Sequence, residues 1–430
     1  MKFAVPRGTS DILPDAAPLW EELESKARKI CKSYGYREIR TPVYEVINLF
    51  KRSLGPTSDV VNKQLLLVGA GSEPAPTEEN KYALRPEGTA AVVRSYIENS
   101  LDGKENLSKL FYLGPMFRGE RPQKGRLRQF HQSGVEAIGP NSTSPFLDAE
   151  VIALAMHLLK ESGVKAPRLR INSLGSKEDK ANISAWLRGE LAKHKKDLCE
   201  DCQGRFERNV FRVLDCKKEG CRKVAALVVK NLPLSPESQN YFDEVQTALK
   251  SAGIAFEVSP HLVRGLDYYT HTVFEITAEG LGSQDAVGAG GRYGGLVHEL
   301  GGNENVGGVG FALGMERILL AGGQTTAVML GVDVFVIAMK EEYQPQAFLL
   351  LQQMRQASIR ADMNFTVGSM KSQMGRANKA NARFALILGE DEVNKNTVAV
   401  KDMQAGTQET VELKNIVSVL EERTRSRKVL

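Results

Sequence analysis

The sequence predicts an α+β protein: an antiparallel sheet flanked by helices, followed by a smaller α/β domain. Strand-like runs outnumber helices in the first part of the chain and do not alternate strictly with them. A charged helical segment over 177–257 interrupts this part, and strict strand–helix alternation follows residue 332. We therefore expect a first domain over 1–324 with an insertion at 177–257, a linker over 325–331 and a second domain over 332–430.

The composition is that of an ordinary globular protein. The 430 residues are 42% hydrophobic and 25% charged, with a formal net charge of +5. No run approaches the roughly 18 apolar residues that a membrane helix needs, and Pro6 and Arg7 stand where a signal peptide would have its apolar core. Five cysteines do not make a disulfide framework. We expect a cytoplasmic protein with no membrane partner, whose mild positive charge permits binding to a nucleic acid.

Hydrophobic spacing sets the elements of the first domain. Apolar residues recur at helical spacing over 18–35, where Gly35 supplies a C-cap, and again over 148–160. We expect a further helix to begin near Phe311, after a glycine-rich strand. The predicted strands of this domain are 36–42, 109–113, 133–138 and 169–172.

The second domain alternates strands and helices, which predicts an α/β fold. The predicted strands are 332–338, 364–367 and 384–388, and the predicted helices are 344–358 and 372–382.

A basic hairpin loop is the first segment that indicates chemistry. Residues 117–132 hold five basic side chains against one acidic side chain, with strand-like sequence on both sides. Such a run is often only a solvated loop tip. However, Arg118, Arg128, Phe130 and Gln132 share parity, so a hairpin would place them on one face. That face would offer guanidinium groups for phosphate, an aromatic ring for a base and an amide for a polar ligand.

Two further segments combine glycine, arginine and tyrosine. Residues 262–270 carry Arg264 and the pair Tyr268 and Tyr269, which alone would also fit a core with a salt bridge. The glycine-rich stretch 288–317 permits close backbone approach to a ligand and leads to Arg317 in the first turns of a helix. Neither segment matches a P-loop or a Rossmann fingerprint, so those modes of nucleotide binding are disfavoured.

Taken in order, these segments resemble the three motifs of class II aminoacyl-tRNA synthetases. The motifs are a proline-ended strand after a long helix, an arginine-bearing hairpin, and a glycine-rich strand that enters a helix with Gly-Met-Glu-Arg at 314–317. Within that class, Pro-Arg-Gly-Thr at 6–9, Leu-Arg-Pro-Glu-Gly-Thr at 84–89 and Leu-Val-Arg-Gly-Leu-Asp-Tyr-Tyr at 262–269 resemble signatures of histidyl-tRNA synthetases. The resemblance extends over nearly the whole chain.

The resemblance implies an ATP-dependent ligase that joins L-histidine to tRNA(His) through a histidyl-adenylate. Mg²⁺ would bridge the β- and γ-phosphates of ATP. The class builds its first motif, here around 35–45, into a subunit interface, which implies a homodimer. The insertion would contact the tRNA acceptor stem, and the last domain would bind the anticodon stem.

The resemblance also implies roles for single residues. Arg118 and Arg264 would be catalytic at the α-phosphate, and Arg317 would bind the γ-phosphate. The other implied ATP contacts are Arg126 over the phosphate tail, Glu120 at the adenine amino group and Phe130 on the ring. The implied histidine-binding residues are Glu87, Gly88, Thr89, Arg118, Gln132, Glu136, Arg264, Tyr268, Tyr269 and Tyr293.

Within the histidine set, the resemblance places Glu136 and Tyr269 at the imidazole. It places Glu87, Thr89 and Gln132 at the α-ammonium group. The even spacing of Gln132 and Glu136 lets them share one sheet face.

One position departs from the family pattern. Many relatives carry an acidic residue after Gly-Gly-Arg-Tyr, whereas this chain has Gly294.

Four cysteines lie in the insertion with the spacing Cys199-x2-Cys202-x13-Cys216-x4-Cys221. This spacing fits no common zinc ribbon, and we therefore predict buried free thiols and no metal site. A zinc ion held by four thiolates is the chemical alternative.

The second domain carries a basic stripe, with six basic residues and one acid over 355–383. Such a stripe is usually a solvated helix face. The resemblance makes Lys371, Arg376 and Lys379 candidate contacts to tRNA phosphates.

Two other functions are weighed against the ligase. A histidine-sensing regulatory subunit of ATP phosphoribosyltransferase shares the catalytic-domain fold, but it would be expected to lose the second domain and the ATP-binding arginines. A tRNA-binding module without chemistry would not need the small-molecule residues. The chain has both the arginines and about 100 residues after the linker, which favours the ligase.

Overall fold

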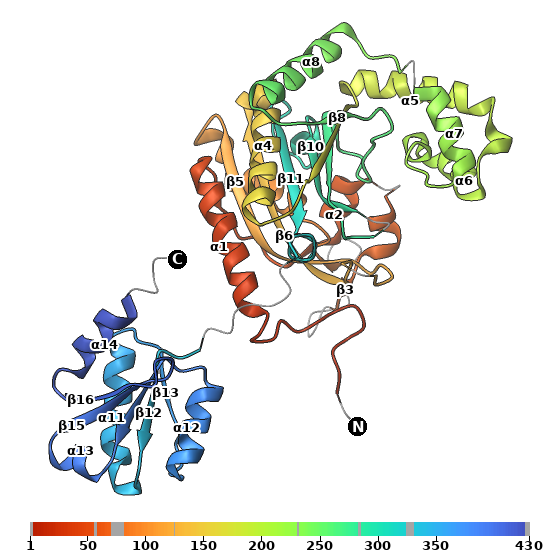
Figure 1. The fold of residues 1–430 in the computed structure, drawn as a ribbon. Coiled ribbons are helices and arrows are strands. Elements are labelled where there is room, and N and C mark those ends of the chain that lie inside the picture. The colour runs from red at the N-terminus through yellow and green to blue at the C-terminus, as the bar shows by residue number, and fades with distance from the viewer. Residues whose placement is uncertain are drawn as a thin grey trace. The chain divides into compact units, whose positions relative to one another are not determined.

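The computed structural model describes residues 3–55, 58–69, 81–123, 125–229, 232–282, 285–323 and 331–425. They belong to two compact units, Met1–Ala327 and Val328–Leu430 (Figure 1). Of the predicted linker over 325–331, only Gly331 lies among the described residues. Within these ranges no helix is long and apolar enough to cross a membrane.

An eight-stranded sheet forms the centre of the first unit, with strand order β1-β5-β6-β11-β10-β9-β7-β8. The pairings from β5 through to β7 are antiparallel, and the short edge strands β1 and β8 pair in parallel. The strands are β1 (Arg37–Glu38), β5 (Ser108–Phe117), β6 (Gln129–Gly139), β7 (Arg168–Ser173), β8 (Glu257–Val258), β9 (Thr270–Thr277), β10 (Ala286–Arg292) and β11 (Gly307–Gly314). The antiparallel-rich sheet of the predicted fold class is confirmed.

Helices cover both faces of this sheet because its strands are apolar on both sides. Phe111 and Tyr112 follow each other in β5 and enter different hydrophobic cores, since successive side chains point to opposite faces. The core with Phe111 takes side chains from α1, α4 and α8, and the core with Tyr112 takes them from α2, α3 and the insertion. The helices outside the insertion are α1 (Ala17–Ser33), α2 (Ile47–Leu54), α3 (Thr89–Glu98), α4 (Pro145–Glu161), α9 (Leu296–Glu299) and α10 (Met315–Ala321).

A small antiparallel sheet with strand order β2-β4-β3 lies in the same unit. Its strands are β2 (Tyr44–Val46), β3 (Leu67–Val68) and β4 (Tyr82–Leu84). Short helical turns complete the two units: η1 (Val60–Gln64), η3 (Leu101–Gly103), η4 (Pro140–Thr143), η5 (Lys195–Asp197), η6 (Val210–Val213) and η8 (Glu341–Tyr343).

The insertion between β7 and β8 is helical, as predicted. Its first helix begins at a capping box in which Ser176 and Asp179 exchange hydrogen bonds with each other's backbone N–H. Helices α5, α6 and α7 lie on the side of the unit away from α1 (Figure 1). The four helices are α5 (Lys177–Ala192), α6 (Glu200–Arg208), α7 (Glu219–Val228) and α8 (Pro236–Ser251).

The second unit holds a five-stranded sheet with strand order β13-β12-β14-β15-β16. The first three strands are parallel, and β15 and β16 continue the sheet as an antiparallel hairpin. The strands are β12 (Val334–Ala338), β13 (Ala361–Met363), β14 (Phe384–Leu388), β15 (Thr397–Asp402) and β16 (Gln408–Glu412). The helices are α11 (Gln344–Gln356), α12 (Met370–Lys379), α13 (Glu390–Asn394) and α14 (Ile416–Arg425).

Two predicted elements are wrong in position. The helix expected from about Phe311 begins at Met315, because β11 continues through Gly314 as a central strand paired on both edges. The strand expected over 364–367 lies at Ala361–Met363 instead. Asn364 ends it with a turn, in which its side-chain amide donates to the carbonyl of Thr366.

Candidate active site

One cavity of about 190 Å³ brings together the segments that the sequence singled out. Its walls come from the β5–β6 hairpin, the start of α3, the loop before β9, and the strands β10 and β11 with the start of α10. The predicted site residues that line it are Glu87, Thr89, Arg118, Glu120, Arg126, Phe130, Gln132, Arg264, Tyr268, Tyr269 and Arg317.

Arg118 is held on three sides at the base of the hairpin. Its backbone N–H donates to the carbonyl of Arg128 at 2.8 Å, and its Nε donates to the carbonyl of Pro86 at 2.9 Å. The guanidinium lies 5.3 Å from the centre of the Phe130 ring, a cation–π distance. Burial lowers the pKa of Arg118 from its ordinary value, although the carboxylates of Glu120 and Glu87 oppose that shift. The cavity therefore has a fixed positive charge at this wall.

Arg264 supplies a second fixed charge from the loop before β9. Its Nη1 lies 2.9 Å from Oε2 of Glu275, and both side chains are mostly buried. Its Nε is buried and has no hydrogen-bond partner within the described part of the chain. A buried donor of this kind is costly unless a ligand satisfies it. Tyr268 and Tyr269 follow on the same loop, with ring centres 4.5 Å apart.

Arg317 and Arg126 also line the cavity. Arg317 is buried at the start of α10, and burial together with the nearby charge of Arg126 lowers its pKa. Nη1 of Arg126 lies 3.6 Å from Oε2 of Glu120. Because Arg126 and Arg317 both line the cavity and the charge of one affects the other, together they favour a ligand with several negative charges.

A cluster of polar groups closes the inner end of the cavity. Glu87 accepts hydrogen bonds from the backbone N–H groups of Thr89 at 2.7 Å and Ala90 at 2.9 Å, which are the first N–H groups of α3. Burial raises the pKa of Glu87, and these hydrogen bonds offset the rise only in part. Gln132 also lines this end, and its Oε1 is buried without a partner among the described atoms.

Glu136 lies behind this inner wall and does not line the cavity. Its Oε1 accepts from Oγ1 of Thr89 at 2.7 Å, and its Oε2 accepts from the hydroxyl of Tyr293 at 2.5 Å. Complete burial raises the pKa of Glu136 to about 8. Its predicted contact with imidazole stays a prediction. A carboxylate oxygen can accept a second hydrogen bond, so both existing bonds are compatible with that contact.

Gly88 and Tyr293, like Glu136, do not line the cavity. A Cβ on Gly88 would lie 2.3 Å from the ring of Tyr112, so this position has no room for a side chain. A Cβ on Gly310 of β11 would lie 2.0 Å from Oε2 of Glu136. Glycine on this strand therefore makes the space that the Glu136 carboxylate occupies.

Sequence reasoning missed several residues. His131 and Glu316 join the hairpin strand to α10: the His131 N–H donates to both carboxylate oxygens, at 2.9 and 3.0 Å, and its Nδ1 lies 2.9 Å from Oε1. Both residues lie in motifs that the sequence analysis identified. Their pairing could not be predicted, because it depends on the register between β6, which carries His131, and β11, which leads to Glu316. Gly294 donates its N–H to Oγ1 of Thr270 at 3.2 Å. His131, Glu316 and Gly294 do not line the cavity; the lining residues that were not predicted are Gly125, Leu127, Leu266, Ala286, Val287, Gly288, Ala289, Phe311, Ala312 and Gly314.

The basic residues predicted on the second unit share the exposed side of α12. Lys371, Arg376 and Lys379 are exposed, whereas Gln373 and Ala377 on the same helix are buried. Arg376 donates to the side-chain oxygen of Asn364. The three positive charges are open to solvent.

Comparisons with known proteins agree along the whole chain. A family profile described as histidyl-tRNA synthetase matches residues 8–318, and one described as anticodon binding domain matches residues 333–423. The histidine–tRNA ligase of Moorella thermoacetica is 47% identical over 421 residues, covering 96% of this chain and 96% of that protein. The histidine–tRNA ligase of Geobacillus sp. (strain WCH70) is 46% identical over 430 residues, covering 98% of this chain and 100% of that protein. The crystal structure of apo S. aureus histidyl-tRNA synthetase matches with a TM-score of 0.80 at 34% identity, covering 98% of this chain and 100% of that one.

The antiparallel sheet with its arginine-lined cavity, followed by an anticodon-binding unit, defines a class II aminoacyl-tRNA synthetase. This makes the chain an ATP-using enzyme of the ligase type. The chain belongs to the histidyl-tRNA synthetase family, whose members ligate histidine to tRNA. The alternative of a non-catalytic regulatory subunit is not favoured, because the curated relatives at this coverage are histidine–tRNA ligases.

Proposed function

We propose that this chain carries out both steps of histidine–tRNA ligation in the arginine-lined cavity. ATP and L-histidine form histidyl-adenylate and pyrophosphate, and the 3′-hydroxyl of the terminal adenosine of tRNA(His) then takes the histidine and releases AMP. The observation that supports this proposal is that Arg118, Arg264 and Arg317, which lie far apart in the sequence, line one cavity.

The first step needs fixed positive charge more than any other group. When the histidine carboxylate attacks the α-phosphorus of ATP, negative charge gathers on the phosphate oxygens, and charges already held in place stabilise it without reorganisation. In the proposal Arg118 and Arg264 supply that charge. The Nε of Arg264 would donate to a phosphate oxygen, which satisfies a buried donor that has no partner among the described protein atoms.

The remaining ATP contacts follow from the positions around Arg118. Phe130 would stack on the adenine ring, and Glu120 would accept from the adenine amino group. Arg126 and Arg317, which also line the cavity, would bind the phosphate tail. ATP would enter as its magnesium complex, with Mg²⁺ on the β- and γ-phosphates to neutralise the leaving pyrophosphate.

Histidine would bind at the inner end of the cavity. Glu87, Thr89 and Gln132 would receive its α-ammonium group, whose charge favours the ionised form of the buried Glu87 carboxyl. Glu136 and Tyr269 would satisfy the two imidazole nitrogens, with Tyr268 beside them. A site that satisfies both nitrogens rejects analogues without them, because its own polar groups would be left unpaired.

Three surfaces support proposals about macromolecular partners. The exposed basic side of α12 would bind tRNA phosphates, and the insertion would contact the acceptor stem. Near the first motif, Val43, Tyr44 and Val46 are 41%, 49% and 38% exposed, and Tyr44 and Val46 point to the same face of β2. Exposed apolar side chains gathered on one sheet are typical of an interface, so we propose that two copies associate here as a homodimer in the cytoplasm.

ATP–pyrophosphate exchange measured with each amino acid in turn tests the function. We expect exchange with histidine alone. Histidine binding without exchange would instead support the regulatory subunit, and tRNA binding without either would support a binding module.

Sedimentation at low protein concentration tests the dimer, and an active monomer would refute it.

A further inference from the structure

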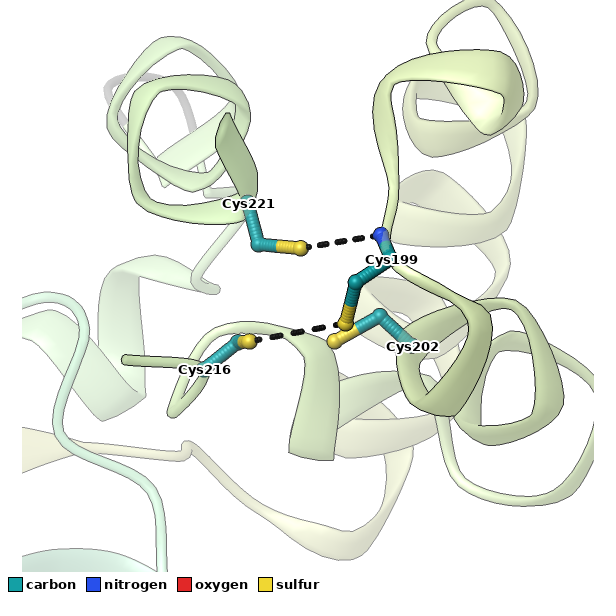
Figure 2. A group of neighbouring side chains, drawn as sticks. All are labelled: Cys199, Cys202, Cys216 and Cys221. Atoms are coloured by element: carbon teal, nitrogen blue, oxygen red, sulfur yellow. Dashed lines mark hydrogen bonds between the residues drawn. The ribbon is translucent and has the colours of Figure 1, made fainter. Parts of the chain in front are cut away.

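Four of the five cysteines meet at one point in the insertion. Cys199 immediately precedes α6, Cys202 lies in its first turn, Cys216 lies in the loop after η6, and Cys221 lies in the first turn of α7. Their Sγ atoms all lie within 4.8 Å of one another. Figure 2 shows the four side chains pointing toward one another from these separate segments. The fold therefore groups four sulfurs that the sequence spacing predicted to be separate buried thiols without a metal.

The separations suit a shared metal ion. Four sulfurs at about 2.3 Å from a zinc ion in tetrahedral geometry lie about 3.8 Å from one another. The Sγ atoms of Cys199 and Cys216 are 4.0 Å apart, so small side-chain rotations would complete the tetrahedron. The separations do not fit disulfides, whose sulfurs are about 2.05 Å apart, and all four cysteines are free.

The surroundings favour thiolates at this point. The N-termini of α6 and α7 both face the cluster, and a helix N-terminus carries partial positive charge. The backbone N–H of Cys199 donates to Sγ of Cys221 at 3.2 Å, the kind of hydrogen bond that supports a metal-bound thiolate. Cys202, Cys216 and Cys221 are buried, which excludes water from the ligand atoms.

The fifth cysteine shows what a structural thiol looks like in this protein. Cys31 is fully buried in α1 among apolar side chains, and burial raises its pKa to about 12. A lone buried thiol of this kind behaves as a small hydrophobic side chain. The other four cysteines differ from Cys31, because their sulfurs face one another at two helix N-termini and are not surrounded by apolar side chains alone.

We propose that Cys199, Cys202, Cys216 and Cys221 bind one structural zinc ion through four thiolates. Soft thiolate ligands in a tetrahedral set select zinc, and a fourth protein ligand leaves no open position for catalysis.

The zinc would fix the part of the insertion that contacts the catalytic loop. Between the two cysteine pairs, Asn209 donates to Oδ1 of Asp267 at 2.8 Å, and Arg212 forms an ion pair with Asp59 at 3.2 Å. Asp267 stands between Arg264 and Tyr268 in the chain. A metal that closes the loop over 199–221 limits its freedom and so holds this contact in place.

Metal analysis of the full chain tests the proposal. The protein is purified without chelator and without a metal-affinity tag, and its metals are measured by mass spectrometry. We expect about one zinc ion per chain, released when an organomercurial blocks the thiols. Replacing zinc with cobalt is expected to give the intense visible absorption of tetrahedral thiolate coordination.

Matched variants locate the site. The double variant Cys199→Ser, Cys202→Ser is expected to lose the zinc, whereas Cys31→Ala, which removes the one cysteine outside the cluster, is expected to keep it. Chelation is expected to lower the thermal midpoint of the wild type and of Cys31→Ala alike.

Several results would overturn the proposal, and they do not depend on the variants folding. A folded wild-type chain with below about one tenth of a zinc ion, even after growth with added zinc, and no cobalt absorption would show free thiols. An intact mass lowered by disulfide formation would show a redox pair, and iron in place of zinc would refute the assignment of the metal.

Discussion

The chain holds positive charge in two different ways. Around the cavity, Arg317 is buried and Arg118 and Arg264 are partly buried, and they are held by neighbouring elements, a carbonyl and a carboxylate, respectively. On α12 the basic side chains extend into solvent. The first arrangement provides charge that is fixed before the substrate arrives, and the second provides charge that attracts a partner over a distance.

The physical difference lies in screening. A charge pair interacts far more strongly when protein surrounds it than when water does, and dissolved salt weakens mainly the exposed pair. We therefore expect changes in the cavity to reduce the rate of chemistry, and changes on α12 to reduce RNA affinity in a salt-dependent way. The predictions below test this contrast, starting with the largest effect.

Arg264→Ala is expected to lower the rate of ATP–pyrophosphate exchange by about 10³-fold, because it removes a preorganised charge at the reacting phosphate. Exchange kinetics with saturating ATP and histidine measure this loss, and circular dichroism checks the fold. The matched control is Arg168→Ala, since Arg168 forms an exposed ion pair with Glu279 in the same unit. A wild-type rate for Arg264→Ala would remove this residue from the proposed mechanism.

The variant Glu136→Gln tests the effect of burial on an ionisable group, through the pH dependence of stability. Because the pKa of Glu136 is raised to about 8 from an ordinary 4.5, the folded chain keeps a proton that the unfolded chain has already released. The contribution of this group to stability therefore falls as pH rises from about 4.5 to about 8, and is constant above that. Urea midpoints of the two proteins at several pH values measure it. The wild type is expected to lose stability relative to the variant across this window, and parallel curves would contradict the raised pKa.

Substitutions on α12 are expected to have the smallest effects. Lys371→Ala and Lys379→Ala should each weaken tRNA binding a few-fold and reduce the slope of log affinity against log salt by about 1. Filter binding at several salt concentrations measures this, with Lys414→Ala as the control because Lys414 is exposed elsewhere on the unit beside Glu412. Pyrophosphate exchange without tRNA should be unchanged, and a loss there would break the contrast between the two sets of charges.

Local sequence predicted the fold well where the hydrophobic period was unambiguous. The helix over 18–35 and the strands near Lys109, Ser133 and Phe384 lie close to where they were expected. The end of the strand Gly307–Gly314 was predicted wrongly, because a helix was expected to begin near Phe311. A central strand that is buried on both faces shows no alternation of apolar and polar residues, so its apolar run cannot be told from the start of a helix. Phe365, Thr366 and Val367 have strong β-propensity but lie outside any strand, with a bend at the first two.

The sequence predicted which residues form the candidate site better than it predicted which of them line the cavity and which lie behind its wall. Parity placed Arg118, Arg128, Phe130 and Gln132 together, and the cavity is lined by all of them except Arg128. Parity also put Glu136 on that face, but it does not say how deep a side chain lies, and Thr89 and Tyr293 cover Glu136. The grouping of the four cysteines depends on how α6 and α7 pack, which spacing alone does not give.

The close packing of Gly310 against Glu136 limits which substitutions the two positions can accept. The carboxylate occupies the volume that a methyl group on residue 310 would need. Positions 136 and 310, on adjacent strands, are therefore expected to covary, since enlarging one without shrinking the other would push the acid out of reach of Thr89. In the proposed function, where Glu136 binds the imidazole, Gly310 therefore contributes to amino-acid selectivity although it does not itself line the cavity.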